Sequence, residues 1–221
     1  MKQTLLIVFL GLGLLALSAC GLSNKERSVP IAEKAGAPEQ KVAVGDSVMV
    51  DGSYQVNVTD SKLAWRGTKI VGNSHTGIAP LRSGSLLING GHLSGGELII
   101  DLSALKSDEN IEALENHLKS ADFFDVTAYP EAKLVITEVK SGDTAGLYQV
   151  TGDLTIKGMT APVSFVAEVR SEEQDLLATA ELKIDRTVWG LKYGSGKFFQ
   201  DLGDKVISDD IEFTVSLRAQ R

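Results

Sequence analysis

Alternation of apolar and polar residues is the feature that most constrains the fold of this chain. In the segment 146–156, Tyr148 and Val150 point to one side of an extended chain, while Gln149 and Thr151 point to the other. A period of two residues is the period of a β-strand with one apolar face. The same alternation marks the segments 52–58, 61–71, 84–89, 92–101, 132–140, 163–169, 178–184 and 211–217. The sequence therefore predicts an all-β domain in which each strand has one face to bury.

The length of these segments bears on how the sheet closes. Several run to about ten residues, whereas strands of globular proteins usually have about five or six. Gly90 and Gly91 provide a hairpin turn between two of them, since glycine adopts the positive φ angles that such turns need. A sandwich and a barrel both satisfy the pattern, and the strand length favours an antiparallel barrel of about eight strands. Such a barrel is either filled by side chains or holds one small ligand. Small inward residues such as Ala167 and Ala178 leave room for a cavity, but the pattern alone does not decide between these two interiors.

One stretch interrupts the strand pattern. Leu114 and Leu118 recur at helical spacing, and the aromatic pair Phe123 and Phe124 follows before the next strand. We expect a short helix between the first four strands and the rest. We further expect the stretch 116–130 to pack as a lid or clamp against the end of the barrel.

The N-terminus carries the features of an export signal. Lys2 is followed by an apolar run from Leu5 to Ala16, which is too short for a convincing membrane span, and then by Leu17-Ser18-Ala19-Cys20. This tetrapeptide resembles the lipobox of bacterial lipoproteins, in which the chain is cut before the cysteine and the cysteine is acylated. Cys20 is the only cysteine in the sequence, so no internal disulfide can form. The alternative is an ordinary secretory signal with an incidental cysteine.

These features divide the chain into three parts. We predict a lipoprotein signal peptide over residues 1–19, a lipidated N-terminus and flexible linker over 20–48, and a single barrel domain over 49–221. The linker is rich in Ala, Glu, Lys, Ser and Pro and has no sustained apolar period. We therefore expect an exported protein of the bacterial cell envelope, anchored to a membrane through acylated Cys20 on the periplasmic face.

The charge of the chain argues against nucleic-acid binding. The formal net charge is −7 at pH 7, and no stripe of Lys and Arg is visible in the sequence. Binding to phosphates needs clustered basic residues. We expect no nucleic-acid partner.

The polar motifs do not assemble a catalytic or metal site. His75, His92 and His117 lack the i, i+4 spacing of helical metal ligands and have no cysteine beside them. The stretch Gly72–Gly77 resembles a serine elbow only superficially, because its second glycine comes one residue late. We expect His117 to cap or hydrogen-bond the turn between the helix and Phe123, and His75 to do the same for a loop next to Gly77. We expect Arg186 to pair with an acidic residue or to receive a polar headgroup. The sequence predicts no catalytic residue, no metal and no cofactor.

Several motifs together resemble the YceI family. They follow one another from about Tyr54 to Leu217 and cover nearly the whole predicted barrel. They are Leu63-Ala64-Trp65-Arg66-Gly67, His75-Thr76-Gly77, His117 to Asp125 with Tyr129-Pro130, Val150 to Gly158, Pro162-Val163 and Asp185 to Gly190. The resemblance implies a lipocalin-like antiparallel barrel with an open interior pocket, which binds a polyisoprenoid or a related lipid or quinone.

The resemblance also implies that the ligand lies along the barrel axis. We expect its apolar wall to be made by inward residues, namely Leu63, Trp65, Leu154, Phe165, Leu182 and Phe213. We expect its mouth to be made by aromatic residues, namely Phe123, Phe124, Trp189, Tyr193, Phe198 and Phe199. Plain core packing is the alternative role for any one of these side chains.

Two classes of function follow from this sequence. The first is a membrane-tethered binding protein that stores or transfers an elongated apolar ligand in the cell envelope. The second is an interaction or adhesion scaffold whose barrel is filled and whose loops meet a protein partner. An enzyme acting on a bound lipid is a weaker third hypothesis. A continuous interior cavity would favour the first class over the second.

Overall fold

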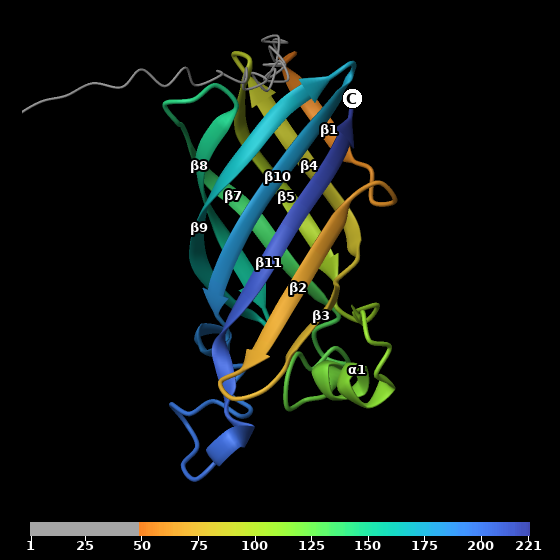
Figure 1. The fold of residues 1–221 in the computed structure, drawn as a ribbon. Coiled ribbons are helices and arrows are strands. Elements are labelled where there is room, and N and C mark those ends of the chain that lie inside the picture. The colour runs from red at the N-terminus through yellow and green to blue at the C-terminus, as the bar shows by residue number, and fades with distance from the viewer. Residues whose placement is uncertain (1–48) are drawn as a thin grey trace, which may run out of the picture. The chain divides into compact units, whose positions relative to one another are not determined.

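A closed antiparallel β-barrel dominates the structure, a computed structural model that describes residues 49–221 (Figure 1). Eight strands form the ring, because β1 pairs with both β4 and β11 and so joins the two ends of the sheet. In order around the ring, the strands are β1 (Gly52–Val56), β4 (Leu81–Asn89), β5 (His92–Asp101), β7 (Glu131–Ser141), β8 (Leu147–Ile156), β9 (Met159–Glu172), β10 (Asp175–Asp185) and β11 (Ile207–Gln220). This closure pairs the strand edges that an open sheet would leave free.

Three further strands extend the sheet at one end of the barrel. They are β2 (Lys62–Lys69), β3 (Ser74–Ile78) and β6 (Lys106–Ser107). The long strand β11 pairs with β2 near its start and with β1 near its end. β3 pairs with β2, and β6 pairs with β3.

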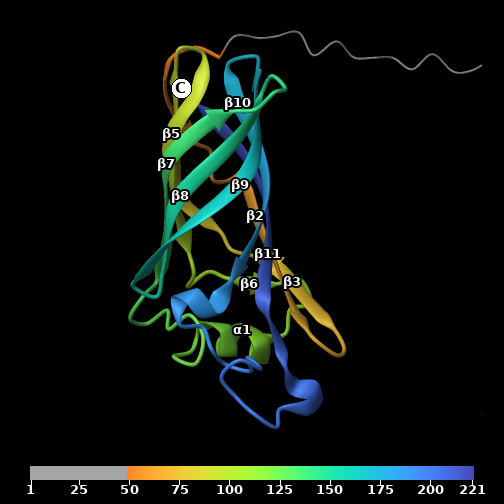
Figure 2. The ribbon, with the colours of Figure 1, turned by 90° about the vertical axis from the view of Figure 1, so that its left-hand side faces the viewer.

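The same end of the barrel carries the only α-helix of the described residues, α1 (Glu112–Lys119), and the loop 120–130 (Figures 1 and 2). We call this helix and loop together the lid. The buried Glu115 fixes it to β6, since its carboxylate accepts hydrogen bonds from the backbone N–H of Ser107 at 2.9 Å and from Lys106 Nζ at 3.1 Å. Two short 3-10 helices, η1 (Arg186–Trp189) and η2 (Gly203–Lys205), lie between β10 and β11 at this end as well.

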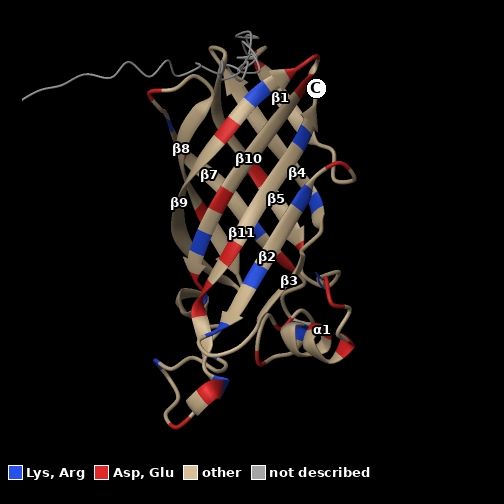
Figure 3. Cartoon of the chain, viewed as in Figure 1, with Lys and Arg blue, Asp and Glu red and all other residues tan. Residues whose placement is uncertain are grey.

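The predicted fold class is confirmed. The structure is an all-β antiparallel barrel of eight strands with one short helix between the early strands and the later ones. In β8 the alternation holds along the whole strand, with Tyr148, Val150, Leu154 and Ile156 buried. Figure 3 shows that residues of both charge signs are interspersed along the strands of the barrel.

The stretch around His75 differs from the prediction. We expected a loop there, whereas Ser74–Ile78 forms β3. Gly77 pairs with Trp65 across β2 and β3, and a Cβ at Gly77 would lie 2.6 Å from the indole ring. The strand therefore needs glycine at this position. Because glycine has no apolar side chain, it breaks the alternation of apolar and polar residues from which we predict strands, and β3 was missed.

Candidate ligand-binding cavity

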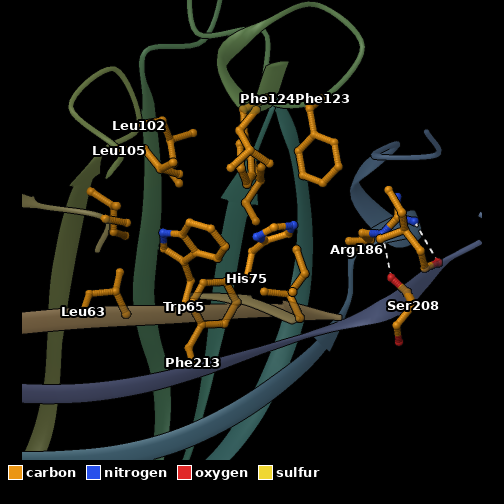
Figure 4. A pocket seen from close by; sticks show the side chains of 18 of the residues that line it. Leu63, Trp65, His75, Leu102, Leu105, Phe123, Phe124, Arg186, Ser208 and Phe213 are labelled. Atoms are coloured by element: carbon orange, nitrogen blue, oxygen red, sulfur yellow. Dashed lines mark hydrogen bonds between the residues drawn. The ribbon is translucent and has the colours of Figure 1, made fainter. Parts of the chain in front are cut away.

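The barrel encloses a cavity of about 530 Å³ at the end that carries the lid. We call it the lid chamber. Its walls come from the inward faces of the strands, and Figure 4 shows Trp65 and Phe213 on β2 and β11 facing Phe123 and Phe124 of the lid. The volume lies within the range of about 300–1,000 Å³ that is typical of small-molecule sites.

Strand β2 shows how the sequence builds this wall. Leu63, Trp65, Gly67 and Lys69 follow one another at a period of two, and all four line the lid chamber. A Cβ at Gly67 would have no neighbouring atom within 4 Å. Gly67 therefore faces open space inside the barrel.

The lid closes the chamber with apolar side chains. Phe123 and Phe124 are buried and pack edge to face, with ring centroids 5.1 Å apart. The backbone N–H of Phe124 donates to the carbonyl of Leu118 at 3.0 Å. Lys157, in the turn between β8 and β9, donates to the carbonyls of Ala121 at 2.7 Å and Phe123 at 3.0 Å. The lid is thus held from β6 on one side and from the turn between β8 and β9 on the other.

His117 combines a role in the lid with a position on the chamber wall. It lies in the last turn of α1, and its carbonyl accepts hydrogen bonds from the N–H and the hydroxyl of Ser120, which confirms that it hydrogen-bonds the turn after the helix. Its ring packs edge to face on Tyr193, with centroids 4.4 Å apart. Three lining residues, Lys69, Tyr193 and Lys205, are exposed to solvent and define the mouth of the chamber.

Arg186 joins the segment between β10 and β11 to the barrel. Its guanidinium is fully buried and donates to the carbonyls of Ser208 at 3.0 Å and Ile207 at 3.3 Å (Figure 4). Asp209 lies 3.6 Å from it, so the expected pairing with an acidic residue is confirmed. Burial lowers the pKa of Arg186, while the carboxylates of Asp209 and Asp185 oppose that shift.

Comparison with known proteins assigns this barrel to a family. Residues 54–219 match the family model described as the YceI-like domain. The chain belongs to the YceI-like family.

Related YceI-like sequences match parts of the chain. The UPF0312 protein of Pseudomonas putida F1 is 44% identical over 80 residues, which are 36% of this chain and 41% of the relative. The UPF0312 protein of Photorhabdus laumondii is 35% identical over 114 residues, which are 52% of this chain and 57% of the relative. The match thus spans about two fifths of the length of the Pseudomonas putida relative.

Solved structures share the YceI-like fold at low sequence identity. Burkholderia cenocepacia BcnA superposes with a TM-score of 0.64 at 21% identity and covers 75% of this chain and 99% of its own. A polyisoprenoid binding domain from Saccharophagus degradans superposes with a TM-score of 0.60 at 19% identity and covers 76% of this chain and 97% of its own. The barrel architecture and its apolar chamber together indicate the binding of an apolar ligand.

Most of the predicted wall and mouth residues meet in the lid chamber of this YceI-like domain. Its lining contains Leu63, Trp65, Phe123, Phe124, Leu154, Leu182, Tyr193 and Phe213. Phe165, Trp189, Phe198 and Phe199 are not part of that lining. Contact of each lining residue with a ligand stays a prediction.

The four residues outside the lining have different surroundings. Phe165 faces inward farther from the lid and lines a separate cavity of about 60 Å³, which we call the far cavity. Trp189 is buried beside β8 and donates its indole N–H to the carbonyl of Leu154 at 2.8 Å. Phe198 and Phe199 are 48% exposed each, because the turn at Ser195 directs this part of the chain outward. Of the three aromatic residues expected at the mouth after Trp189, Tyr193 alone lines the lid chamber.

Some lining residues were missed at the sequence level. Leu98, Leu134 and Val215 line both the lid chamber and the far cavity, and with Leu182 they form a constriction between the two. Lys69 was also missed, although its spacing from Leu63 and Trp65 places it on the inward face of β2. Lysines in strands usually point outward to solvent, so the two-residue spacing of Lys69 from Leu63 and Trp65 was not interpreted as an inward position.

The structure also bears on metals and membrane spans. Within residues 49–221, no group of three or more His, Cys, Asp and Glu side chains is arranged to hold a metal ion. In the same residues, no helix is long and apolar enough to cross a bilayer. Cys20, the predicted signal peptide and the predicted linker lie outside the described residues.

Proposed function

We propose that this protein binds an elongated apolar ligand, a polyisoprenoid or a related lipid or quinone, inside its barrel and stores or transfers it in the cell envelope. The lid chamber is the observation that carries the proposal. It is continuous from the mouth to the constriction and is walled by Leu, Ile, Val and aromatic side chains. The polyisoprenoid binding domain of Saccharophagus degradans, which has the same fold, supports this ligand class.

The assignment is to binding without catalysis. Two aliphatic hydroxyl side chains, Thr68 and Ser208, and the phenol of Tyr193 line the chamber, and among residues 49–221 none of these hydroxyls is hydrogen-bonded to a histidine. An activated hydroxyl nucleophile needs such a base. The lining therefore favours retention of an apolar molecule over its chemical conversion.

A cavity-filling variant tests the binding proposal. Gly67→Phe places a ring in the open space of the chamber, and Arg66→Phe places the same ring on the outer face of the same strand. We expect native mass spectrometry and lipid extraction of the full chain, purified from bacteria, to show a bound lipid in the wild type and in Arg66→Phe. We expect Gly67→Phe to retain less than about a tenth of it, because the filled volume no longer admits the tail. A folded wild type without any lipid would contradict the proposal, as would full retention by folded Gly67→Phe.

We also propose that acylated Cys20 anchors the protein to a membrane of the cell envelope. The lipobox-like tetrapeptide before Cys20 supports this anchor. Growth with labelled palmitate should label the wild-type protein and leave Cys20→Ser unlabelled. Label in Cys20→Ser would exclude this site of acylation, and an unlabelled wild type would exclude the anchor.

A further inference from the structure

The charged side chains that line the lid chamber all have one sign. Lys69, Arg186 and Lys205 line it together with His75 and His117, and no aspartate or glutamate is among the residues that line it. The whole chain has a net charge of −7. The charged side chains of this wall are therefore all positive, although the chain as a whole carries a net negative charge.

Two of these cations have no carboxylate partner. Arg186 is paired with Asp209, whereas within residues 49–221 the structure records no ion pair for Lys69 or Lys205. Asp201 and Asp204 belong to the same segment as Lys205, but they are exposed and do not line the chamber. Since neither aspartate forms an ion pair with them within residues 49–221, the two lysines are the unpaired charges of the wall.

The two lysines come from neighbouring segments at the mouth. Lys69 pairs with Ile207 in the sheet, and the N–H of Ile70 donates to the carbonyl of Val206 at 3.0 Å. Lys205 directly precedes Val206, so the chain brings both lysines to the same side of the mouth. Farther in, the β2 stripe from Trp65 to Leu63 is apolar, so a charged mouth leads into an apolar interior.

We infer that the ligand of the lid chamber is an amphiphile whose anionic headgroup, a carboxylate or a phosphate, is bound at the mouth by Lys69 and Lys205. This inference rests on the proposed function and adds the chemistry of the headgroup. An ammonium group offers three donors and a compact charge, which suit both anions. His117 and Tyr193 line the mouth beside the lysines and add hydrogen-bond donors. Leu63 lies six residues from Lys69 along β2, so the tail has on the order of 20 Å of strand to lie against.

Three probes with one tail and different headgroups test the inference. Geranylgeraniol, geranylgeranoic acid and geranylgeranyl monophosphate are titrated into the delipidated full-length protein by isothermal calorimetry. We expect the acid, the phosphate or both to bind at least about tenfold more tightly than the alcohol, as charge-assisted hydrogen bonds imply. The stronger of the two anions identifies the headgroup. The preference should weaken as the salt concentration rises.

Variants assign the preference to the two lysines. Lys69→Gln with Lys205→Gln should bring the affinities for the anions within about threefold of the affinity for the alcohol, since the charge-assisted contacts are removed. Lys69→Arg with Lys205→Arg should keep the preference, as should Lys62→Gln, which removes a lysine from the outer face of β2.

Equal binding of all three probes by the wild type would overturn the headgroup inference and leave the proposed function intact. An unchanged preference in the double glutamine variant would overturn the assignment to these lysines. Binding of none of the probes would count against the proposed function itself.

Discussion

The two halves of the barrel interior have the same alternating pattern but different packing. Around the lid chamber, inward residues such as Leu63, Trp65 and Leu154 keep 8–9% of their surface exposed because they face the cavity. In the far half, Val150 and Val169 are 0–1% exposed, and the remaining cavity measures about 60 Å³. Apolar side chains dominate both linings, and only the lid chamber has lysines at its mouth. The difference shows that side-chain volume and the position of the lid decide where a barrel of this kind is hollow.

The largest expected effect comes from placing a charge in each half. Val150→Asp buries a carboxylate in packed surroundings and should lower the free energy of unfolding by more than about 4 kcal/mol. Leu154→Asp places it on the chamber wall, where water can enter through the mouth, and should cost only about 2 kcal/mol. Urea denaturation of both variants measures the contrast. Equal losses would mean that the chamber is as dry and closed as the far half.

The lid offers the next test. Phe124→Ala removes a buried ring that packs on Phe123 and on the chamber, and should cost about 3 kcal/mol, the low end for such a deletion, because one side of the ring already faces a cavity. We expect ligand to leave the folded variant faster, as measured by transfer to acceptor vesicles. Tyr129→Ala, in the exposed part of the same loop, is the control. Unchanged release from folded Phe124→Ala would remove the lid from the binding mechanism.

The constriction between the halves provides a third and smaller effect. Leu182→Ala should join the lid chamber to the far cavity and cost about 2 kcal/mol, since Leu182 is only partly buried and borders space on both sides. The Leu182→Ala variant should bind isoprenoid alcohols that are longer than the chamber more tightly than the wild type does, and it should bind short ones with unchanged affinity. Leu176→Ala, a fully buried position outside both linings, should cost more stability without this shift in length preference. A series of prenols of increasing length measures the preference, and an identical length profile in Leu182→Ala and the wild type would show that the constriction does not limit the tail.

The sequence could predict the barrel and the position of the lid, but not the hollow. A period of two fixes which side chains point inward, so Leu63, Trp65, Leu154 and Phe213 were assigned correctly to the interior. Whether inward side chains from opposite strands meet depends on register and on the diameter of the ring, which no single strand encodes. The distinction between Phe165 and Leu154 rests on this information.

The mouth was predicted least well because its segments have no period. Between β10 and β11, the aromatic residues Tyr193, Phe198 and Phe199 are similar in composition and setting, yet only Tyr193 lines the chamber. The turn at Ser195 and the anchoring of Arg186 decide their directions. Both are tertiary features of a loop, where local sequence has little influence on direction.

The smallest of the four expected effects is that of acid. Lowering the pH should destabilise the segment between β10 and β11 before it destabilises the far half of the barrel. Burial raises the pKa of Asp185, but hydrogen bonds from Lys197 and Thr187 outweigh it and hold that pKa below its usual value. A lowered folded-state pKa stabilises the protein above the unfolded-state value of about 3.9, and this contribution is lost as the pH falls through the folded-state pKa. Because the carboxylate is about a third exposed, its contribution should stay below about 1 kcal/mol.

Asp185→Asn measures that contribution. The difference in the free energy of unfolding between wild type and variant should be fully present near pH 6 and shrink as the pH falls below about 3.9 and the wild-type carboxylate gains its proton. Hydrogen exchange at pH 6 should show faster exchange of the amides of residues 190–206 in the variant, while amides of β8 and β9 keep the wild-type rate. The Lys197–Asp185 contact of 2.7 Å ties the segment that carries Tyr193 and Lys205 to the end of β10, whereas Val150 and Val169 belong to the packed far half. Equal acceleration in both regions would mean that the mouth and the far half open as one unit, and the contrast between the two halves would then be one of volume alone.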